Sequence, residues 1–461
     1  MQRYDAIIIG TGQAGPALAH RLAGAGKTVA VVERKYFGGT CVNSGCIPTK
    51  TLVASAYAAH LARRAGDYGV EIPGPIVVDM KRVKERKDYV LGFSNRGVER
   101  SLRSNPNIAV YQDHARFTSA SSVSVGDEML TAPKIFINVG GRASVPDIPG
   151  LPEVEYFTNS TILDVDFALP HLIVIGGSYI GLEFAQIYRR FGSGVTVIEL
   201  APRLIPREDE DVSTAVADIL RSEGISLHTS VGNLSVSRRS GGIVAVDFTS
   251  QKGSEVAEGS HLLVAVGRRP NTDDLGLDKA GVAVDKRDYI EVDDHLRTTV
   301  PGIWALGDCN GRGAFTHTAY NDFEIVTANL LDSDDRRVSD RIPAYNLYID
   351  PPLGRAGLTE VEVRKSGQRA LMAKMAMQNV NRAFEKGETQ GFMKVLVDAD
   401  TKLFLGASIL GVGGDEVIHT ILDLMYAKAP FTVMQRAMHI HPTVSELLPT
   451  MLSNLTPLGE T

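Results

Sequence analysis

Tyr4-Asp-Ala-Ile-Ile-Ile-Gly10-Thr-Gly12-Gln-Ala-Gly15 is a short apolar run that ends in three glycines at Gly-x-Gly-x-x-Gly spacing. A helical pattern from Pro16 to Ala25 follows, and a second apolar run ends at Glu33. In this order the glycines let the backbone approach a pyrophosphate, the helix start supplies N–H groups, and the acid accepts a ribose hydroxyl. The pattern predicts an α/β dinucleotide-binding unit held by Gly10, Gly12, Gly15 and Glu33.

The same pattern returns in Leu172-Ile-Val-Ile-Gly176-Gly-Ser178-Tyr-Ile-Gly181, followed by a helical stretch and a strand pattern that ends at Glu199. Each matched position lies 166 residues after its counterpart, as Gly176 does after Gly10. One such motif is weak evidence, but two in the same context predict two dinucleotide sites. We expect the second site to use Gly176, Ser178, Gly181 and Glu199, with Ser178 in place of the middle glycine.

The acid at the end of the second copy bears on the choice of nicotinamide cofactor. A carboxylate at this position accepts a ribose hydroxyl and repels a 2′-phosphate. Glu199 therefore favours NADH, while Arg203 and Arg207 nearby leave NADPH open.

Cys41 and Cys46 lie between the two copies, in Gly39-Thr-Cys41-Val-Asn-Ser-Gly-Cys46-Ile-Pro-Thr-Lys50. In an ideal helix, residues five apart have Cα atoms about 8 to 9 Å apart, whereas a disulfide needs about 4.4 to 6.8 Å. A bond between them therefore needs a distorted turn, which Asn43 and Gly45 can supply. Two small buried thiols, or two ligands of a metal ion completed elsewhere, are the alternatives. Beside a dinucleotide fold, a flavin that accepts hydride and then reduces sulfur gives the pair a function.

Composition and charge exclude several classes of protein. The 461 residues are 44% hydrophobic and 22% charged, which is typical of a globular chain of several domains. A net charge of −6 with both signs interspersed argues against nucleic acid or an anionic membrane as partner. No apolar run reaches the roughly 20 residues of a membrane helix, and no charged leader precedes the first strand. Three cysteines exclude a secreted disulfide framework and a four-cysteine zinc site. We expect a cytoplasmic protein that acts on small molecules and has no metal site.

The segment around the cysteines resembles the redox-active motif of the flavoprotein disulfide reductases, the family of dihydrolipoyl dehydrogenase, glutathione reductase and mercuric reductase. The resemblance runs from Tyr4 to about Leu452. It implies that FAD binds to the first unit, that Cys41 exchanges with the substrate, and that Cys46 lies against the flavin. By the same likeness, the flavin site includes Gly39, Thr40 and Lys50.

Other segments match this family in order. Val264-Ala-Val-Gly267-Arg-Arg-Pro-Asn271 resembles the exit from the nicotinamide domain, and Pro301-Gly-Ile-Trp-Ala-Leu-Gly307-Asp308 resembles the returning flavin strand. The likeness implies that Asp308 holds the ribityl chain. Without it, Asp308 is equally a turn residue at a strand end and Tyr179 a core aromatic. The further cofactor-binding residues that it implies are Thr316 near the flavin, Tyr179 and Glu183 as gate and guide of the nicotinamide, and Gly140 and Gly267.

His441 and Glu446 are the candidate acid–base pair, in His439-Ile-His441-Pro-Thr443-Val-Ser-Glu446. Thiol–disulfide exchange needs a proton acceptor near neutral pH, and a carboxylate keeps an imidazole basic and oriented. In the family the matching pair acts from the neighbouring subunit, which implies a homodimer with a shared active site. Alternatives are a capping box of Thr443 and Glu446, a surface role for His441, and a metal pair with His439.

The expected architecture is α/β, with two Rossmann-like dinucleotide-binding domains and an α+β carboxyl-terminal dimerisation domain. We expect the FAD-binding domain at 1–146 and 271–337, the NAD(P)-binding domain at 147–270, and the dimerisation domain at 338–461. Within the last, alternating residues predict a strand at Phe392–Val397 and a helix near Gly414–Ala427.

The identity of the electron acceptor depends on finer features. Residues 447–461 contain no cysteine, which argues against a true mercuric reductase, and the His441–Glu446 pair favours a dihydrolipoyl-dehydrogenase-like reductase of a small or protein-bound disulfide. Ser44, Asn138-Val-Gly140-Gly141 and Phe315-Thr-His-Thr-Ala319 look more like the mercuric-reductase-like branch with the reactive-chlorine-resistance flavoproteins. The alternatives are therefore a reductase of a soft ion such as copper or mercury, and a redox or nicotinamide sensor flavoprotein.

Overall fold

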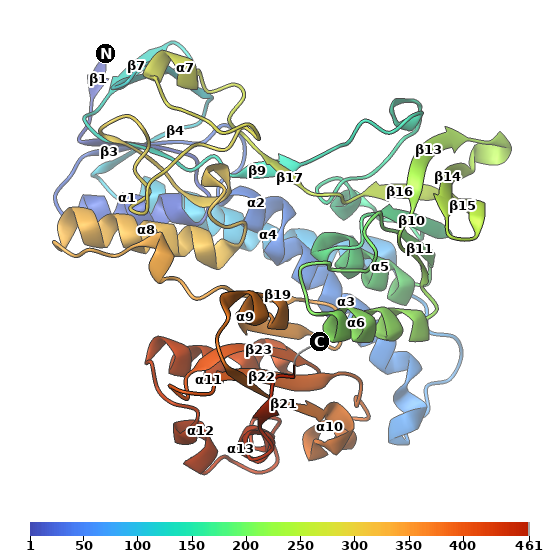
Figure 1. Cartoon of the computed structure of the whole chain (residues 1–461). Coiled ribbons are helices and arrows are strands. Elements are labelled where there is room, and N and C mark those ends of the chain that lie inside the picture. Colours follow the sequence, from blue (N-terminus) through green and yellow to red (C-terminus); the bar gives the residue numbers. More distant parts are fainter. Residues whose placement is uncertain (460–461) are drawn as a thin grey trace.

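Five parallel strands form the first dinucleotide-binding sheet of the computed structural model, which describes residues 1–459 (Figure 1). In the order β18-β8-β2-β3-β4, they are Ile303–Ala305, Ile135–Ile137, Ala6–Ile9, Val29–Val32 and Ile108–Tyr111. Strands β2 and β3 are buried throughout, because both faces of a parallel sheet are covered, and this explains their unbroken apolar runs. Helix α1 (Ala14–Gly24) packs on the sheet and against α8 (Thr316–Leu331).

The second copy of the motif builds a matching parallel sheet. In the order β12-β11-β10-β16, its strands are Ser226–His228, Gly194–Ile198, His171–Ile175 and His261–Val264. Helix α5 (Tyr179–Phe191) follows β10 as α1 follows β2, and α6 (Glu210–Ser222) precedes β12. An antiparallel sheet of β13 (Gly232–Arg238), β14 (Val244–Ser250) and β15 (Gly253–Gly259) adjoins it. The α/β class that the two motifs predict is confirmed.

The chain crosses between these two units on a narrow ribbon. Strand β9 (Gly141–Ala143) leads out of the first unit and pairs antiparallel with β17 (Arg268–Pro270), which leads back. Arg142 on β9 donates to the Pro270 carbonyl at 3.0 Å and pairs with Asp273 at 2.5 Å. The crossing points therefore lie together, close to the expected boundaries at 146 and 270, and the exact boundaries stay a prediction.

A six-stranded antiparallel sheet forms the carboxyl-terminal part. In the order β19-β20-β23-β22-β21-β24, its strands are Ala344–Leu347, Leu353–Gly357, Phe404–Leu410, Phe392–Asp398, Ala370–Ala376 and Thr456–Pro457. Its helices are α9 (Glu360–Ser366), α10 (Asn381–Glu385), α11 (Gly414–Tyr426), α12 (Thr432–Arg436) and α13 (Leu447–Leu452). The strand at Phe392 and the helix at Gly414 begin where the sequence predicts them. Residues 460–461 of the expected last domain lie outside the described part.

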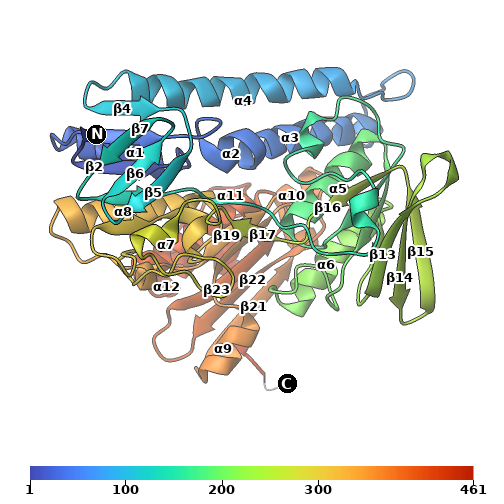
Figure 2. The same ribbon diagram turned by 90° about the horizontal axis from the view of Figure 1, so that it is seen from above.

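Three helices cover the first two units. Figure 2 shows α4 (Met80–Arg103) along one edge of the molecule, beside α3 (Cys46–Arg63) and the short α2 (Gly39–Ser44). A small sheet of β1 (Gln2–Arg3), β7 (Glu128–Thr131), β6 (Ser122–Val125) and β5 (Ala115–Ser119) lies next to α7 (Leu277–Ala280). Within residues 1–459, no helix is both long and apolar enough to cross a membrane.

Candidate functional site

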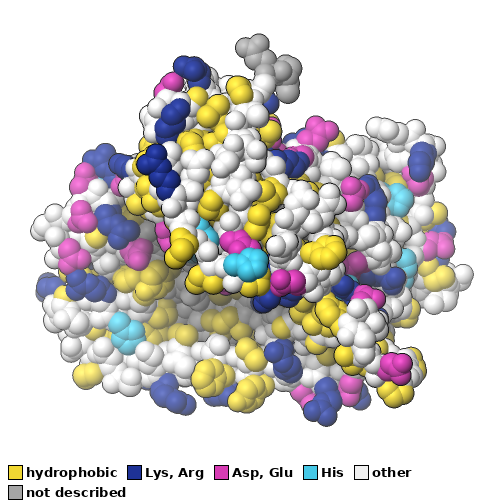
Figure 3. All heavy atoms as spheres, turned by 90° about the horizontal axis from the view of Figure 1, so that it is seen from below, with side chains coloured by type: hydrophobic (Ala, Val, Ile, Leu, Met, Phe, Trp, Pro, Cys, Tyr) yellow, Lys and Arg dark blue, Asp and Glu magenta, His cyan; other side chains and the backbone are white. Residues whose placement is uncertain are grey.

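A cleft of about 1960 Å³ is lined by both dinucleotide-binding units and by the six-stranded sheet. Figure 3 shows a hollow crossing one side of the molecule, with hydrophobic side chains along it. The volume exceeds the roughly 300 to 1,000 Å³ of a pocket for one drug-sized ligand, as two dinucleotides require. The expected site residues that line the cleft are Gly10, Gly12, Glu33, Gly39, Thr40, Cys41, Cys46, Lys50, Gly140, Gly176, Ser178, Tyr179, Glu183, Glu199, Gly267, Asp308 and Thr316.

Gly15 and Gly181 lie beneath the cleft and act through packing. A Cβ at Gly15 would come within 2.3 Å of the Gly10 carbonyl oxygen, and one at Gly181 within 2.0 Å of the Gly176 oxygen. Each third glycine therefore lets its helix pack directly on the turn that faces the cleft. Gly10 has a φ of +102°, and a Cβ there would meet the Asn138 oxygen at 2.3 Å. Turns without side chains leave room for a pyrophosphate to approach the backbone, as both glycine motifs predict.

The two strand-end acids bind the glycine turns. Glu33 accepts from the Thr11 N–H at 3.0 Å and from the Thr11 hydroxyl at 2.6 Å. Glu199 accepts from the N–H of Gly177 at 2.6 Å and from the N–H of Ala201 at 2.7 Å. Each carboxylate is therefore fixed at the end of its strand, where the ribose of a dinucleotide would lie.

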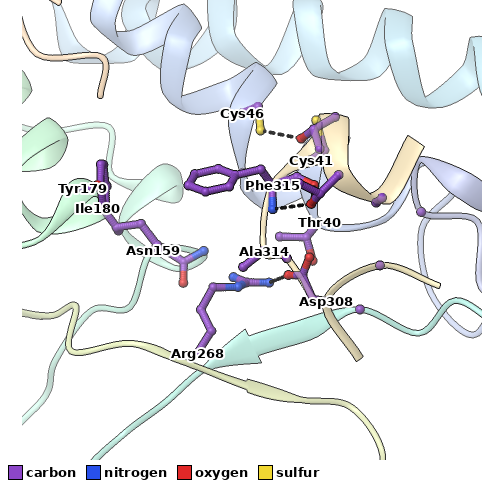
Figure 4. A pocket seen from close by; sticks show the side chains of 18 of the residues that line it. Thr40, Cys41, Cys46, Asn159, Tyr179, Ile180, Arg268, Asp308, Ala314 and Phe315 are labelled. Carbon is purple, nitrogen blue, oxygen red and sulfur yellow. Dashed lines mark hydrogen bonds and ion pairs between the residues drawn. The ribbon is translucent and has the colours of Figure 1, made fainter. Parts of the chain in front are cut away.

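The distorted turn that the cysteine pair requires is present. Helix α2 ends at Ser44, and Gly45 takes φ −135° and ψ −119° before α3 begins at Cys46. A Cβ at Gly45 would lie 2.8 Å from the Thr40 carbonyl oxygen, so only glycine fits. Both thiols are free, and the Cys46 sulfur lies 3.0 Å from the Thr316 hydroxyl at the start of α8 (Figure 4).

The two thiols differ in acidity. The pKa of Cys46 falls to about 6, because Cys41 hydrogen-bonds to its thiolate and because Thr316 and the Lys50 ammonium stabilise the charge against burial. The pKa of Cys41 rises, because its proton is held in the bond to Cys46 and because it is buried. The reduced pair is therefore a thiolate at Cys46 beside a neutral thiol at Cys41. This difference suits the expected roles, in which Cys46 lies against the flavin and Cys41 exchanges with the substrate.

An ion pair links the cysteine helix to the second dinucleotide site. Lys50 on α3 lies 2.7 Å from Glu183 on α5, and the Glu183 side chain is only 6% exposed. The other oxygen of Glu183 accepts from the Tyr348 N–H at 3.0 Å, and the Lys50 ammonium lies over the Tyr348 ring. This pair therefore brings a positive charge to the cleft wall next to Cys46.

Asp308 has a partner that the sequence interpretation did not select. Arg268 donates to the Gly141 carbonyl at 2.6 Å and pairs with Asp308 at 3.2 Å (Figure 4). Asn138 was also missed, and its amide donates to the Gly12 carbonyl at 3.1 Å across the glycine turn. Both residues stand in segments already noted in the sequence, but only the packing shows that they face the cofactor cradle.

His441 and Glu446 form the expected pair but lie away from the cleft of their own chain. The imidazole Nδ1 is 2.9 Å from the carboxylate, and the His441 side chain is 68% exposed. Glu446 precedes α13 and directs its carboxylate to His441, so the alternative capping box with Thr443 is only half formed. Met438 and Ile440 on the same segment are 99% and 80% exposed. An imidazole on an exposed apolar segment fits a surface that a second subunit covers.

Metal binding gains no support from the histidines. His439 Nδ1 lies near the Ala437 carbonyl. Within residues 1–459, the one group of three potential ligands consists of Asp209, Asp211 and Glu360. The Lys394 ammonium contacts all three carboxylates at 2.6 to 2.9 Å. It thereby supplies the positive charge that a metal ion would bring.

The chain is similar to known proteins over nearly its whole length. A family model described as "Pyridine nucleotide-disulphide oxidoreductase" matches residues 4–322, and the dimerisation domain of the same family matches 343–452. The "Probable pyridine nucleotide-disulfide oxidoreductase RclA" of Escherichia coli is 37% identical over 98% of this chain and 99% of that protein. A dihydrolipoyl dehydrogenase of Thermus scotoductus is 34% identical over 97% and 96%, and a mercuric reductase of Streptomyces lividans is 32% identical over 96% and 94%.

Solved structures show the same likeness. The HOCl-induced flavoprotein disulfide reductase RclA from Escherichia coli superposes with a TM-score of 0.89 at 35% identity, covering 98% of this chain and 100% of that one. A structure described as the Cu(II) complex of that protein gives the same TM-score and identity over 98% and 99%.

Proposed function

Because the chain belongs to the pyridine nucleotide-disulphide oxidoreductase family, we propose that Cys41 and Cys46 carry electrons from NAD(P)H, through FAD, to an outside acceptor. The chain is an NAD(P)H-dependent flavin oxidoreductase, and its dimerisation domain supports a homodimer. The further proposals concern which residues act, which nicotinamide is used and what is reduced.

The observation that carries the proposal is the 3.0 Å contact between the Cys46 sulfur and the Thr316 hydroxyl, with Lys50 beside them. These groups stabilise a thiolate at one defined sulfur of the pair. FAD supplies hydride acceptance and reduction of sulfur when it is bound. We assign its binding to the first glycine turn, Glu33, Gly39, Thr40, Gly140 and Asp308, and the nicotinamide site to the second turn, Tyr179, Glu183 and Gly267.

NADH is the proposed reductant. Two backbone N–H groups hold Glu199 at the end of its strand, so its charge would repel the 2′-phosphate of an NADPH whose ribose lay there. Of the two arginines that left NADPH open, Arg203 donates to the backbone oxygens of Pro206 and Glu208, while Arg207 lines the cleft. A reducible cysteine pair also suits a reducing compartment, and we propose a cytoplasmic location.

The proposed acceptor is a small or protein-bound disulfide. Cys41 would attack it, and His441 of the partner subunit, oriented by its Glu446, would hold the proton. A soft metal ion is the second candidate, because a relative has been solved as a Cu(II) complex and others are mercuric reductases. Thiolates are suitable ligands for such ions.

Anaerobic titration of the FAD-loaded protein with NADH tests the relay, followed by its visible spectrum. We expect a long-wavelength absorption band after two electrons, from a Cys46 thiolate beside oxidised flavin, and its loss in Cys46→Ser. Bleaching of the flavin without this band would mean that the cysteines are not coupled to it, and the proposal would fail.

A further inference from the structure

Glu208 is a buried carboxylate behind the cleft wall, next to the lining residues Tyr179, Tyr345 and Arg355, and the sequence pattern does not single it out. It lies just before α6, and its side chain is fully buried. Its own N–H donates to the Ile205 carbonyl, and the Ile205 N–H donates to the carbonyl of Gly177 in the second glycine turn. The backbone that carries Glu208 is therefore tied to the nicotinamide cradle.

Two tyrosine hydroxyls converge on one oxygen of this carboxylate. Tyr179 donates to Glu208 Oε1 at 3.0 Å, and Tyr345 donates to the same oxygen at 2.6 Å. On the other side, Arg355 Nε lies 3.4 Å from Oε2, with the arginine side chain only 2% exposed. The two hydroxyls fix Oε1, while Oε2 and Arg355 Nε are in charge contact without a hydrogen bond.

The groups that hold Glu208 come from a different part of the fold. Tyr345 is on β19 and Arg355 on β20, both in the six-stranded sheet. The next residue, Asp209, pairs with the buried Lys394 on β22 of the same sheet at 2.9 Å. Two successive acids thus anchor the start of α6 to the dimerisation domain, and the first of them also holds Tyr179.

Tyr179 is in turn packed toward the cysteine site. Its ring meets Phe315 edge to face at 6.3 Å and Tyr345 edge to face at 5.6 Å, and Figure 4 shows Phe315 directed toward it. Phe315 precedes Thr316, whose hydroxyl contacts Cys46. Tyr179 therefore lies in the cleft between the second glycine turn and the cysteine pair.

We propose that Glu208 is a positioning residue that holds Tyr179 across the cleft, as a latch. Tyr345 and Arg355 keep the Glu208 carboxylate in place. The inference rests on the proposed function, in which a nicotinamide crosses the cleft past Tyr179 to reach the flavin. Tyr179 then has to leave Phe315, and its hydrogen bond to Glu208 has to break. The apparent affinity for NADH is then the intrinsic affinity multiplied by the fraction of molecules in which the gate is open.

Tyr179→Phe tests the latch, because it keeps the aromatic ring and removes only the donor. The matched control is Tyr188→Phe on the same helix, which removes the buried bond from Tyr188 to the Ile162 carbonyl. The measurement is stopped-flow reduction of the bound flavin over a range of NADH concentrations. A bond to a charged acceptor is strong enough that we expect the apparent Kd for NADH to fall about tenfold. The limiting rate is obtained from the same titrations, and the control should match the wild type.

Glu208→Gln gives a second route to the same prediction. It replaces the charged acceptor by a neutral amide oxygen and so weakens the bond from Tyr179, and it should lower the apparent Kd by less than Tyr179→Phe does. The double variant should match Tyr179→Phe alone, because both changes act on one interaction. If Glu208→Gln does not fold, since it leaves Arg355 without a counter-charge, the Tyr179 variant with its control decides alone.

An unchanged or raised apparent Kd in Tyr179→Phe would overturn the latch. Reduction of each variant with dithionite separates this result from failure of the relay, because that reductant bypasses the nicotinamide site. A long-wavelength band with an unchanged Kd refutes the latch alone. A missing band in the wild type refutes the proposed function, whatever the Kd values are.

Discussion

Lys50 and Glu183 form a 2.7 Å ion pair that joins the helix behind the cysteines to the first helix of the second dinucleotide site. The glutamate is buried and the lysine partly exposed, so the ammonium faces the cleft. A cation is thereby fixed near Cys46 by a residue that belongs to the neighbouring nucleotide site.

Lys50→Met should raise the pKa of Cys46. The ammonium favours the thiolate, and the unpaired Glu183 carboxylate would oppose it, so both effects have the same sign. We expect an upward shift of about one unit, measured from the ultraviolet absorbance of the thiolate in reduced protein. Lys84→Met, which breaks a similar pair with Asp88 on α4, is the control and should leave the midpoint unchanged.

The reduced protein should contain one thiolate at neutral pH. The pKa of Cys46 is lowered from the ordinary 9.0 to about 6, so its thiolate persists down to that pH, where a free thiol is already protonated. Cys41→Ala should move the midpoint upward, because the bond from Cys41 is the largest cause of the shift. Cys46→Ser should abolish the titration near pH 6. Cys309→Ala should not, since burial raises the pKa of that thiol to about 12; a change there would contradict the assignment.

Glu199→Ser should improve the use of NADPH relative to NADH. Removal of one charge facing the 2′-phosphate should raise the NADPH to NADH ratio of kcat/KM about tenfold or more. Steady-state kinetics with both nucleotides measure this ratio. Glu210→Ser, at an exposed position on α6, is the matched loss of charge and should not alter it.

His441→Gln should abolish reduction of disulfides while NADH still reduces the flavin. Loss of a general acid–base group lowers turnover by about 10² to 10⁴. His439→Gln removes the neighbouring imidazole and should be near wild type. If metal-stimulated NADH oxidation survives in His441→Gln and is lost in Cys41→Ser, a metal ion is the better candidate for the electron acceptor. Full disulfide turnover in His441→Gln would show that the His441–Glu446 pair takes no part in the reaction.

Mixed dimers should reveal an active site shared between subunits. His441→Gln and Cys41→Ser are each expected to be inactive as homodimers. A heterodimer of the two has one site with both an intact Cys41 and an intact His441, so the heterodimer purified after co-expression should show up to half of the wild-type disulfide turnover per dimer. Absence of any recovery in purified heterodimers would show that each chain completes its own site.

The sequence patterns predicted those features of the fold that depend on residues close together in the chain. Apolar runs that end in glycine turns predicted both parallel sheets, because a strand buried on two faces has to be apolar throughout. The Gly45 turn followed from the spacing of Cys41 and Cys46, since no regular helix brings them together. Asn138, Arg268 and Glu208 were not selected as site residues, because a single amide, guanidinium or carboxylate has no periodic signal of its own.

The sequence by itself therefore determined the class of chemistry: two dinucleotide cradles, a cysteine pair between them and an imidazole with its carboxylate near the end. Only the tertiary structure decided how these parts control one another. The Thr316 hydroxyl reaches Cys46 across 270 positions of the chain, and Tyr345 reaches Glu208 across 137. Such contacts depend on how separate sheets pack against one another. The free energy of that packing comes from many buried residues, so the spacing of a single motif does not predict it.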